Sequence, residues 1–385
     1  MRVKLKDTFN LQMGKTPSRA DLSMWGGNNK WISIADIGSA KKYISSTKEC
    51  ITDEGVSRSG IKVVPEGTVI MSFKLSIGKT AIVSEDMYTN EAIMAFIDNG
   101  TYCIDPNYLY HLCCGTDWTQ GGNKAVMGLT LNKATLSEME IELPTIEEQR
   151  EIASILDQLD AIIEKRHDEL NMIEQLVKSR FIELFGDPKS NPKGYTKKQL
   201  GETCKVITGN TPSRAVAEYY GDHIEWIKTD NIISGLLNPT TATEFLSEKG
   251  MTVSRTVESG AILMACIAGS VSSIGRVCVT NRKVAFNQQI NAIVPYDYNI
   301  LFLYAMLQIS KEYLVDGINM ALKGILSKSK LEEKTFFVPP IELQEQFAAF
   351  VEQTDKSKYF ACQTLSFLLK LANNLQSWRE KQYDY

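Results

Sequence analysis

The sequence predicts an α+β fold: two similar β-rich globular domains separated by two long antiparallel helices that form a coiled coil, related by an internal duplication with pseudo-two-fold symmetry. Three observations lead to this prediction. Residues 147–186 place an apolar side chain at nearly every third or fourth position, which is typical of one face of a long helix. Residues 338–378 carry a similar pattern. Short motifs of the first half return about 195 residues later in the second half.

The composition is that of an ordinary globular protein. Of 385 residues, 43% are hydrophobic and 23% are charged, which is enough for sizeable cores in two or three domains. No apolar run is long enough to span a membrane, and residues 1–16 lack an apolar core flanked like that of a signal peptide. We therefore expect a cytoplasmic protein with reduced cysteines and no membrane partner.

Net charge becomes informative only when it is divided along the chain. The whole chain carries a formal charge of −4. Residues 147–186 contain 5 basic and 10 acidic side chains, whereas residues 187–337 contain 17 basic and 14 acidic ones. The negative charge of one helix can thus offset the positive charge of a weakly basic domain in the total. The overall charge neither supports nor excludes nucleic acid as a partner.

The first long helix has clear start and stop signals. Glu147, Glu148 and Glu151 place negative charge in its first turn, and residues 186–188 (Gly-Asp-Pro) end it. At about 1.5 Å per residue it is roughly 58 Å long, and its apolar face needs a partner. The second helix supplies that face. We expect the helix-pair interface to contain Ile152, Leu156, Leu159, Ile163, Leu170, Ile173 and Val177 from the first helix, and Phe347, Phe350, Val351, Leu365, Leu368 and Leu375 from the second.

The duplication also sets the expected domain boundaries. Residues 14–19 (Gly-Lys-Thr-Pro-Ser-Arg) recur as 209–214 (Gly-Asn-Thr-Pro-Ser-Arg), and Trp31 recurs as Trp226. A period this long is that of a domain plus a helix and not that of a solenoid. We expect a first domain at 1–143, a helical spacer at 144–186, a second domain at 187–337, a second helical spacer at 338–378 and a C-terminal tail at 379–385.

Short apolar or alternating runs between Gly, Asn and Asp turns predict the strands of each domain. In the first domain these runs lie at 31–34, 69–73, 80–83 and 92–97. In the second domain they lie at 262–266, 276–279 and 290–294, and a helix is expected at 299–314.

The sequence carries no catalytic motif. Residues 14–16 and 78–80 (Gly-Lys-Thr in both) look like the end of a phosphate-binding loop, but Phe9 and Phe73 stand where that motif requires glycine. No dinucleotide-binding glycine pattern follows a strand, and no tetrapeptide typical of an adenine methyltransferase occurs. We therefore expect a binding protein and not an enzyme.

A zinc site is the less favoured interpretation of the cysteines near His111. Cys113 and Cys114 are adjacent, unlike the spacing that lets two thiolates reach one zinc ion. We interpret these two residues and Cys103 as buried thiols of a β-rich domain, and we expect no metal.

Several motifs occur in a fixed and duplicated order. They are the 14–19 turn with its repeat, the strand region from Trp31 to Ile37, the segments 144–149 and 339–344 that open the two long helices, and residues 184–188 that close the first. In this order they resemble the specificity subunits of type I restriction-modification systems over essentially the whole chain.

This resemblance implies a function. Such subunits carry two target-recognition domains, each of which reads one half of a bipartite DNA sequence, and two helical spacers that set the gap and dock two methylation subunits. Restriction/translocation subunits complete the assembly. The partners implied for this chain are double-stranded DNA and those subunits. S-adenosylmethionine, ATP and Mg are expected in the partner subunits, and no cofactor is expected in this chain.

Base reading favours particular side chains on loops. Arg and Lys pair with guanine, Asn and Gln pair with adenine, and Ser and Thr assist. A structural role is the open alternative for each cluster, either as a turn or as solvated lysines. The candidate DNA-binding residues are Lys15, Ser18, Arg19, Lys74, Ser76, Lys79, Gln120, Asn123 and Lys124 in the first domain, and Asn210, Ser213, Arg214, Ser272, Ser273, Arg276, Asn319 and Lys323 in the second.

Two other function classes stay open. A DNA-reading module of a different defence or modification complex could use the same scaffold, and neighbouring genes for methylation and motor subunits would distinguish it. A protein-binding adaptor with two non-DNA modules would have no affinity for duplex DNA even with its partner subunits present.

Overall fold

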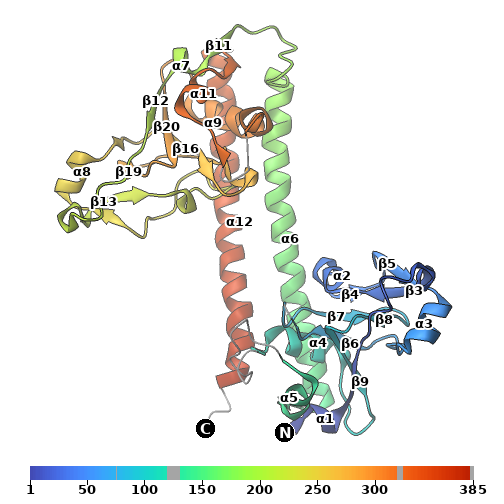
Figure 1. The fold of residues 1–385 in the computed structure, drawn as a ribbon. Helices are drawn as coiled ribbons and strands as arrows, with labels where there is room; N and C mark the ends of the chain where they lie inside the picture. The colour runs from blue at the N-terminus through green and yellow to red at the C-terminus, as the bar shows by residue number, and fades with distance from the viewer. Residues whose placement is uncertain (75, 119–130, 319–323, 382–385) are drawn as a thin grey trace. The chain divides into compact units, whose positions relative to one another are not determined.

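The structure is a computed structural model that describes residues 1–74, 76–118, 131–318 and 324–381, with all side chains of these except those of 271 and 373–381. The chain forms two compact units. Unit one contains Met1–Glu164 and the last helix from Ser366 onward, and unit two contains Lys165–Leu365. Each unit combines a β-rich module with segments of two long helices (Figure 1). The expected duplicated α+β fold is confirmed.

Module one, within unit one, is closed by a two-stranded ribbon. Its first strand, β1 (Arg2–Lys4), pairs antiparallel with its last, β10 (Glu140–Glu142). The other described elements of module one are α1 (Leu5–Thr8), β2 (Phe9–Met13), η1 (Leu22–Met24), β3 (Trp25–Ile32), α2 (Ile34–Ser39), β4 (Tyr43–Ile44), β5 (Glu49–Ile51), α3 (Asp53–Ser59), β6 (Val69–Ser72), β7 (Thr80–Val83), β8 (Tyr88–Thr89), β9 (Ile93–Asp98), α4 (Pro106–Gly115) and α5 (Lys133–Glu138).

The main sheet of module one determines where its loops gather. Its strand order is β2-β9-β6-β7-β4, and a second sheet has the order β5-β3-β8. Both β2 and β6 run antiparallel to β9. They therefore point the same way, and the loops that begin at Gly14 and Phe73 leave the sheet at the same end of these strands. We call this end of the sheet the shared loop edge.

Strand β6 lies between two hydrophobic cores and buries both of its faces, so its sequence is a continuous apolar run. Val69 and Met71 belong to one core, which also contains Phe9. Ile70 belongs to the other core, with Ile32. Alternate side chains of one short strand thus hold two layers of module one together.

Module two, within unit two, repeats this plan. A ribbon of β11 (Lys197–Gln199) and β22 (Thr335–Phe337) closes it. The other described elements are α7 (Leu200–Thr203), β12 (Cys204–Thr208), η2 (Ala217–Tyr219), β13 (Tyr220–Ile227), η3 (Thr229–Asn231), β14 (Phe245–Leu246), α8 (Glu248–Val253), β15 (Thr256–Val257), β16 (Ile262–Ala265), β17 (Ile267–Ala268), η4 (Val271–Ser273), β18 (Val277–Val279), β19 (Val284–Phe286), β20 (Ile290–Pro295), α9 (Ile300–Ile309), α10 (Lys311–Val315), β21 (Gly324–Ile325) and α11 (Lys328–Glu332). Its sheets have the orders β12-β20-β16-β18 and β14-β13-β19-β15, and β17 pairs with β21. Both β12 and β16 are antiparallel to β20, so module two has its own shared loop edge.

The long helices are α6 (Ile146–Phe185) and α12 (Ile341–Lys381). Thr145 and Glu148 cap the start of α6: the Thr145 amide donates to Glu148 Oε2 at 2.9 Å, and the Glu148 amide donates to Thr145 Oγ1 at 3.3 Å. Gly186, with a φ of 81°, ends the helix in the left-handed conformation that glycine adopts without strain.

Within unit two the two helices run antiparallel. Phe181 of α6 lies 5.4 Å from Phe347 of α12, measured between ring centroids. Earlier in α6, Glu174 Oε1 accepts a hydrogen bond from Lys358 Nζ at 2.7 Å. Because Glu174 precedes Phe181 while Lys358 follows Phe347, the chain directions oppose each other. Val177 packs against the same core as Phe181 and Phe347.

The expected helix-interface residues fall on the less exposed faces of α6 and α12, and their assignment to one interface stays a prediction. Leu375 lies outside the described side chains. Of the others, Leu156, Leu159, Phe347, Val351 and Leu365 are buried, and Ile152, Ile163, Leu170, Ile173, Val177, Phe350 and Leu368 are half-buried.

Two sequence-based expectations for local structure were wrong. The strand expected at 31–34 ends at Ile32, because Ser33 caps α2: its amide donates to Asp36 Oδ2 at 2.8 Å and its hydroxyl accepts from the Asp36 amide. The helix expected at 299–314 is divided into α9 and α10 at Ser310, whose ψ of 15° departs from helical geometry.

Candidate nucleic-acid interface

The candidate DNA-binding residues of module one lie on two loops of its shared loop edge. Glu91, just before β9 at the same edge, links these loops. The Thr16 hydroxyl donates to Glu91 Oε2. This bond, a backbone hydrogen bond of Glu91 and the charges of Lys74 and Arg19 hold the pKa of Glu91 below its usual value despite burial. The structure thus brings two predicted clusters together around a carboxylate that sequence reasoning missed.

The 14–19 turn is held against the sheet by close packing. A Cβ atom on Gly14 would lie 2.2 Å from the carbonyl oxygens of Thr89 and Asn90, so only glycine fits there. The indole Nε1 of Trp31 donates to the carbonyl oxygen of Lys15 at 3.0 Å. These contacts explain why the glycine and the tryptophan recur together in the sequence.

Arg19 completes this packing. Its guanidinium carbon lies 3.8 Å from the centre of the Trp25 ring and 5.1 Å from that of Trp31. Its Nη2 also donates to Glu49 Oε2 at 2.9 Å. A planar cation between an aromatic face and a carboxylate holds the turn in place. Contact between Arg19 and DNA stays a prediction.

Module two repeats the arrangement with different residues. Trp226 Nε1 donates to the carbonyl oxygen of Asn210 at 3.3 Å. The guanidinium carbon of Arg214 lies 4.5 Å from the ring centre of Tyr220, and its Nη2 donates to Glu244 Oε2 at 2.6 Å. The same turn is therefore fixed in both modules by an arginine between an aromatic ring and a glutamate.

The second predicted cluster of module two is tied to its surroundings through the backbone. Arg276 donates to the carbonyl oxygens of Thr229 at 3.1 Å and Ser273 at 3.3 Å. The carbonyl oxygen of Ser272 accepts from Lys311 Nζ at 2.5 Å. These bonds order the loop before β18, and Arg276 is half-buried.

Exposure differs among the candidates. Asn210 has a structural role, because its Nδ2 donates to the Val253 carbonyl oxygen at 2.9 Å and its Oδ1 accepts from the Arg255 amide at 2.8 Å. Exposed candidates are Lys15, Ser18, Arg19, Ser76, Lys79, Ser213, Arg214 and Ser272, and half-buried ones are Lys74, Asn210, Ser273 and Arg276.

The third predicted cluster of each module lies outside the described residues. It contains Gln120, Asn123 and Lys124 in module one and Asn319 and Lys323 in module two. Their flanking residues are described. Buried Trp118 lies against Gly78 in the loop after β6. In module two, β21 (Gly324–Ile325) pairs with β17 (Ile267–Ala268) in the loop after β16.

Comparison with protein families decides the identity of this fold. The family model described as the type I restriction modification DNA specificity domain matches residues 1–175 and again residues 192–360. The chain belongs to this family. As a specificity subunit it supplies sequence recognition and not catalysis, as the sequence predicted.

Individual relatives agree with this assignment. The chain is 26% identical to the type I restriction enzyme MjaIX specificity subunit of Methanocaldococcus jannaschii over 377 residues, which cover 91% of this chain and 85% of the relative. It is 29% identical to the HindI specificity subunit of Haemophilus influenzae over 181 residues, or 42% of this chain and 38% of the relative.

Two solved structures have the same fold. The S subunit of M. genitalium superposes with a TM-score of 0.56 at 14% identity, covering 98% of this chain and 94% of that one. A chain from work on complex assembly and conformational transition of the type I R-M system superposes with a TM-score of 0.59 at 18% identity, covering 98% and 97%.

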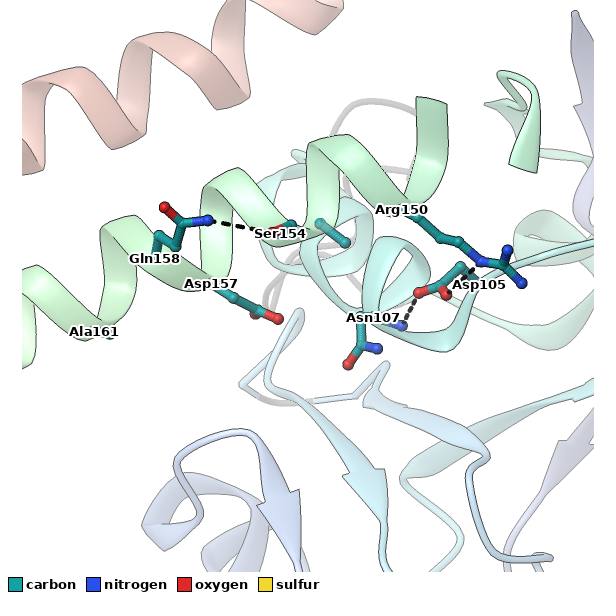
Figure 2. A pocket seen from close by; sticks show the side chains of 8 residues that line it. Asp105, Asn107, Arg150, Ser154, Asp157, Gln158 and Ala161 are labelled. Atoms are coloured by element: carbon teal, nitrogen blue, oxygen red, sulfur yellow. Dashed lines mark hydrogen bonds and ion pairs between the residues drawn. The ribbon is translucent and has the colours of Figure 1, made fainter. Parts of the chain in front are cut away.

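Unit one of this specificity subunit has an open hollow of about 390 Å³ between α4 and α6 (Figure 2). Arg150 reaches toward Asp105, with Nε 3.9 Å from Oδ2, and Gln158 donates to Ser154 on its own helix at 3.3 Å. The charged groups of the hollow are therefore partly paired with each other. Its lining residues are Asp105, Asn107, Arg150, Ala153, Ser154, Asp157, Gln158 and Ala161.

The expected burial of the cysteines near His111 is only partly right. Cys113 is buried, but Cys103 and Cys114 are exposed. Cys113 and Cys114 lie on helix α4 and not on a strand. Among the described residues no cluster of His, Cys, Asp and Glu could hold a metal ion. No helix in the described part of the chain combines the length and apolarity needed to cross a membrane.

His111 instead joins module one to α6. Its Nε2 lies 2.7 Å from Asp157 Oδ1, which also accepts from Lys42 Nζ at 2.5 Å. Burial would raise the pKa of Asp157, but the hydrogen bonds from Lys42 and His111 outweigh it, and the pKa is lowered. Burial lowers the pKa of His111 although Asp157 and Asp160 oppose that shift.

We expect unit one to lose stability as the pH falls below about 6.5. The unfolded histidine takes up a proton near that pH, whereas the folded one resists it, so the unfolded state binds more protons and the free energy of unfolding decreases with acidification. The slope contributed by His111 is at most about 1.4 kcal/mol per pH unit. Thermal melting of the wild type and of His111→Asn between about pH 5 and 7.5 measures it.

The control is His223→Asn, which changes an exposed histidine of module two. It should leave the pH profile of the wild type unchanged. An equally steep profile in His111→Asn would show that other groups cause the acid sensitivity.

Proposed function

We propose that this specificity subunit reads a bipartite double-stranded DNA sequence for a type I restriction-modification complex, with one half read at the shared loop edge of each module. The observation that carries the proposal is the repeated convergence of two loops at one sheet edge. Exposed Ser18 and Lys79 in module one, and Ser213 and Ser272 in module two, provide hydrogen-bonding groups on those loops. Such groups can contact base edges or phosphates.

The two halves of the target are expected to differ, because the equivalent loops differ in length. In module one the amide of Ser72 donates to the carbonyl oxygen of Lys79 at 2.8 Å, and in module two Ala265 bonds in the same way to Arg276 at 2.9 Å. These pairs are 7 residues apart (79 − 72) and 11 residues apart (276 − 265). The same scaffold therefore presents two different surfaces to DNA.

We further propose that α6 and α12 set the gap between the two half-sites. Half-sites read from one face of DNA lie about one helical turn apart, roughly 34–36 Å. Helix α6 has 40 residues and is thus roughly 60 Å long, which is long enough for this role. An insertion of whole helical turns should change the gap and leave the bases unchanged.

The same helices are proposed to dock two methylation subunits. Large apolar side chains face solvent on the unit-two segments of both helices: Met172 is 65% exposed, Leu176 52% and Phe360 69%. Exposed apolar groups of this size are typical of surfaces that another protein covers. A duplicated chain offers two similar surfaces, which fits two identical partners.

The remaining components belong to the partner subunits in this proposal. Restriction/translocation subunits join the methylation subunits, and the partners bind S-adenosylmethionine, ATP and Mg. The chain itself binds no cofactor and acts in the cytoplasm, where the genomic DNA is accessible.

The experiment that tests the function is a map of N6-methyladenine across the host genome, with and without the gene for this chain. We expect one bipartite motif to lose methylation when the gene is removed and to regain it on complementation. An unchanged methylation pattern, in a host that expresses the partner subunits, would contradict the proposal.

The docking surface is tested by Leu176→Lys. A charge on an apolar site that the methylation subunit covers should weaken binding of that subunit by about tenfold or more. The melting temperature of the chain alone should stay unchanged, because Leu176 is exposed in it. Titration calorimetry with the purified methylation subunit measures the affinity. The matched control is Gln175→Lys, which adds the same charge at the neighbouring exposed position. Equal affinities of the two variants would exclude this face of α6.

A further inference from the structure

Two glutamines occupy equivalent places at the starts of the long helices. Gln149 lies in the first turns of α6 and Gln344 in those of α12, 195 residues apart (344 − 149). Their exposed fractions are 0% and 1%. A buried amide must find hydrogen-bond partners, since an unpaired one is costly. Their partners show what these residues do.

Gln149 connects α6 to module one through three backbone groups. Its Oε1 accepts from the Asp105 amide at 2.9 Å. Its Nε2 donates to the carbonyl oxygens of Cys103 at 3.1 Å and Pro144 at 3.0 Å. Asp105 is the N-cap of α4, and Pro144 lies two residues before the start of α6. One side chain thus fixes the start of a module helix to the start of the long helix.

Gln344 makes the same connection in unit two. Its Oε1 accepts from the Asn299 amide at 2.9 Å, and its Nε2 donates to the carbonyl oxygen of Pro339 at 2.8 Å. Asn299 is the N-cap of α9, as Asp105 is of α4. Each glutamine oxygen therefore holds a module helix, and each glutamine nitrogen holds the proline segment before a long helix.

The other contacts at these junctions differ between the two units. Lys42 pairs with Asp157 in unit one. The residue of unit two equivalent to Lys42 is Leu237. The Lys42 carbonyl oxygen accepts a hydrogen bond from the Ile82 amide, and the Leu237 carbonyl oxygen accepts one from the Val279 amide at the same place in module two. Leu237 packs against the apolar core of its unit. The hydrogen bonds of the glutamine are thus present at both junctions, although the neighbouring contact is an ion pair in unit one and apolar packing in unit two.

We infer that Gln149 and Gln344 are positioning residues that fix the tilt of each module on its long helix and so restrict the complex to one gap between half-sites. This inference rests on the proposed function. The bonds involve backbone groups of known direction, so each amide can hold only one orientation of the module. One base-pair step is about 3.4 Å along the DNA axis, so a small tilt at the junction shifts a loop edge by a whole step.

The experiment uses the complete complex of this chain with its methylation subunits. Duplexes carry the recognised motif with its native gap, or with a gap one base pair shorter or longer, and the initial rate of N6-adenine methylation is measured on each. The variant Gln149→Met keeps the length and most of the volume of the side chain but cannot make the three bonds. We expect the preference for the native gap to fall by about tenfold or more, with the recognised bases unchanged.

The matched control is Gln158→Met, an exposed position on the same helix, which should retain the preference of the wild type. If Gln149→Met does not yield folded protein, Gln344→Met, which loses two bonds instead of three, carries the same test for module two. A folded variant with the native preference would overturn the inference, and so would a change in the recognised bases. If the wild type itself methylated no bipartite sequence, the proposed function would fail instead.

Discussion

Replacing Phe181 by alanine is expected to cost about 3–5 kcal/mol of the stability of unit two, the range for truncating a fully buried phenylalanine. Phe181 has an exposed fraction of 0%. Its ring centroid lies 5.1 Å from that of Phe185, 5.5 Å from Phe302 and 5.4 Å from Phe347. These rings come from α6, α9 and α12, so the cavity would open where the module meets both long helices.

Hydrogen exchange of the backbone amides is the appropriate measurement, because a chain with two units need not unfold in one step. The strands of module two should lose protection, and those of module one should keep it. The neighbouring residue gives the control: Ile182 is 39% exposed, and Ile182→Ala should cost less than about 1 kcal/mol. Equal losses of protection in the two variants would mean that the aromatic cluster does not stabilise unit two.

A methyl group added at Gly209 should prevent module two from recognising DNA. The added Cβ would lie 2.2 Å from the carbonyl oxygen of Asn287 and 2.5 Å from that of Phe286. Both are backbone atoms that cannot rotate away, so the 209–214 turn must move by about 1 Å. We expect Gly209→Ala to lower stability by about 1–3 kcal/mol and to abolish recognition of the half-site that module two reads.

Binding to a duplex that contains only this half-site, measured with the assembled complex, checks the functional part. The matched control is Gly201→Ala in α7, at the opposite end of β12 from the turn, where the nearest atom to the added Cβ is Glu332 Cβ at 3.1 Å. That variant should bind like the wild type. Normal binding by Gly209→Ala would show that the turn is not part of the recognition surface.

The long helices could be predicted from sequence because their signals are local. The apolar spacing of 147–186 and Gly186 predicted α6 to within one residue at its start and end. The end of β3 at Ile32 could also have been found, since Ser33 and Asp36 have the spacing of a helix cap. The division at Ser310 has no comparable signal in the sequence.

The site was less predictable because its contacts join distant residues. The recurrence of the 14–19 turn indicated that it matters, but nothing in the sequence places Arg19 over Trp25 or beside Glu49. Likewise the repeated glutamines were visible as part of a motif, whereas their bonds to Asp105 and Asn299 depend on the folded arrangement. The choice of individual DNA-contacting residues stays a prediction.

The ribbons that close each module have an evolutionary consequence. Because β1 pairs with β10, and β11 with β22, the first and last strands of each module lie side by side. Chain segments whose ends lie side by side can be exchanged as cassettes with little disturbance of the remainder. Recombination at these ribbons would therefore give hybrid proteins with a new half-target in one step, while the surfaces of the long helices remained unaltered.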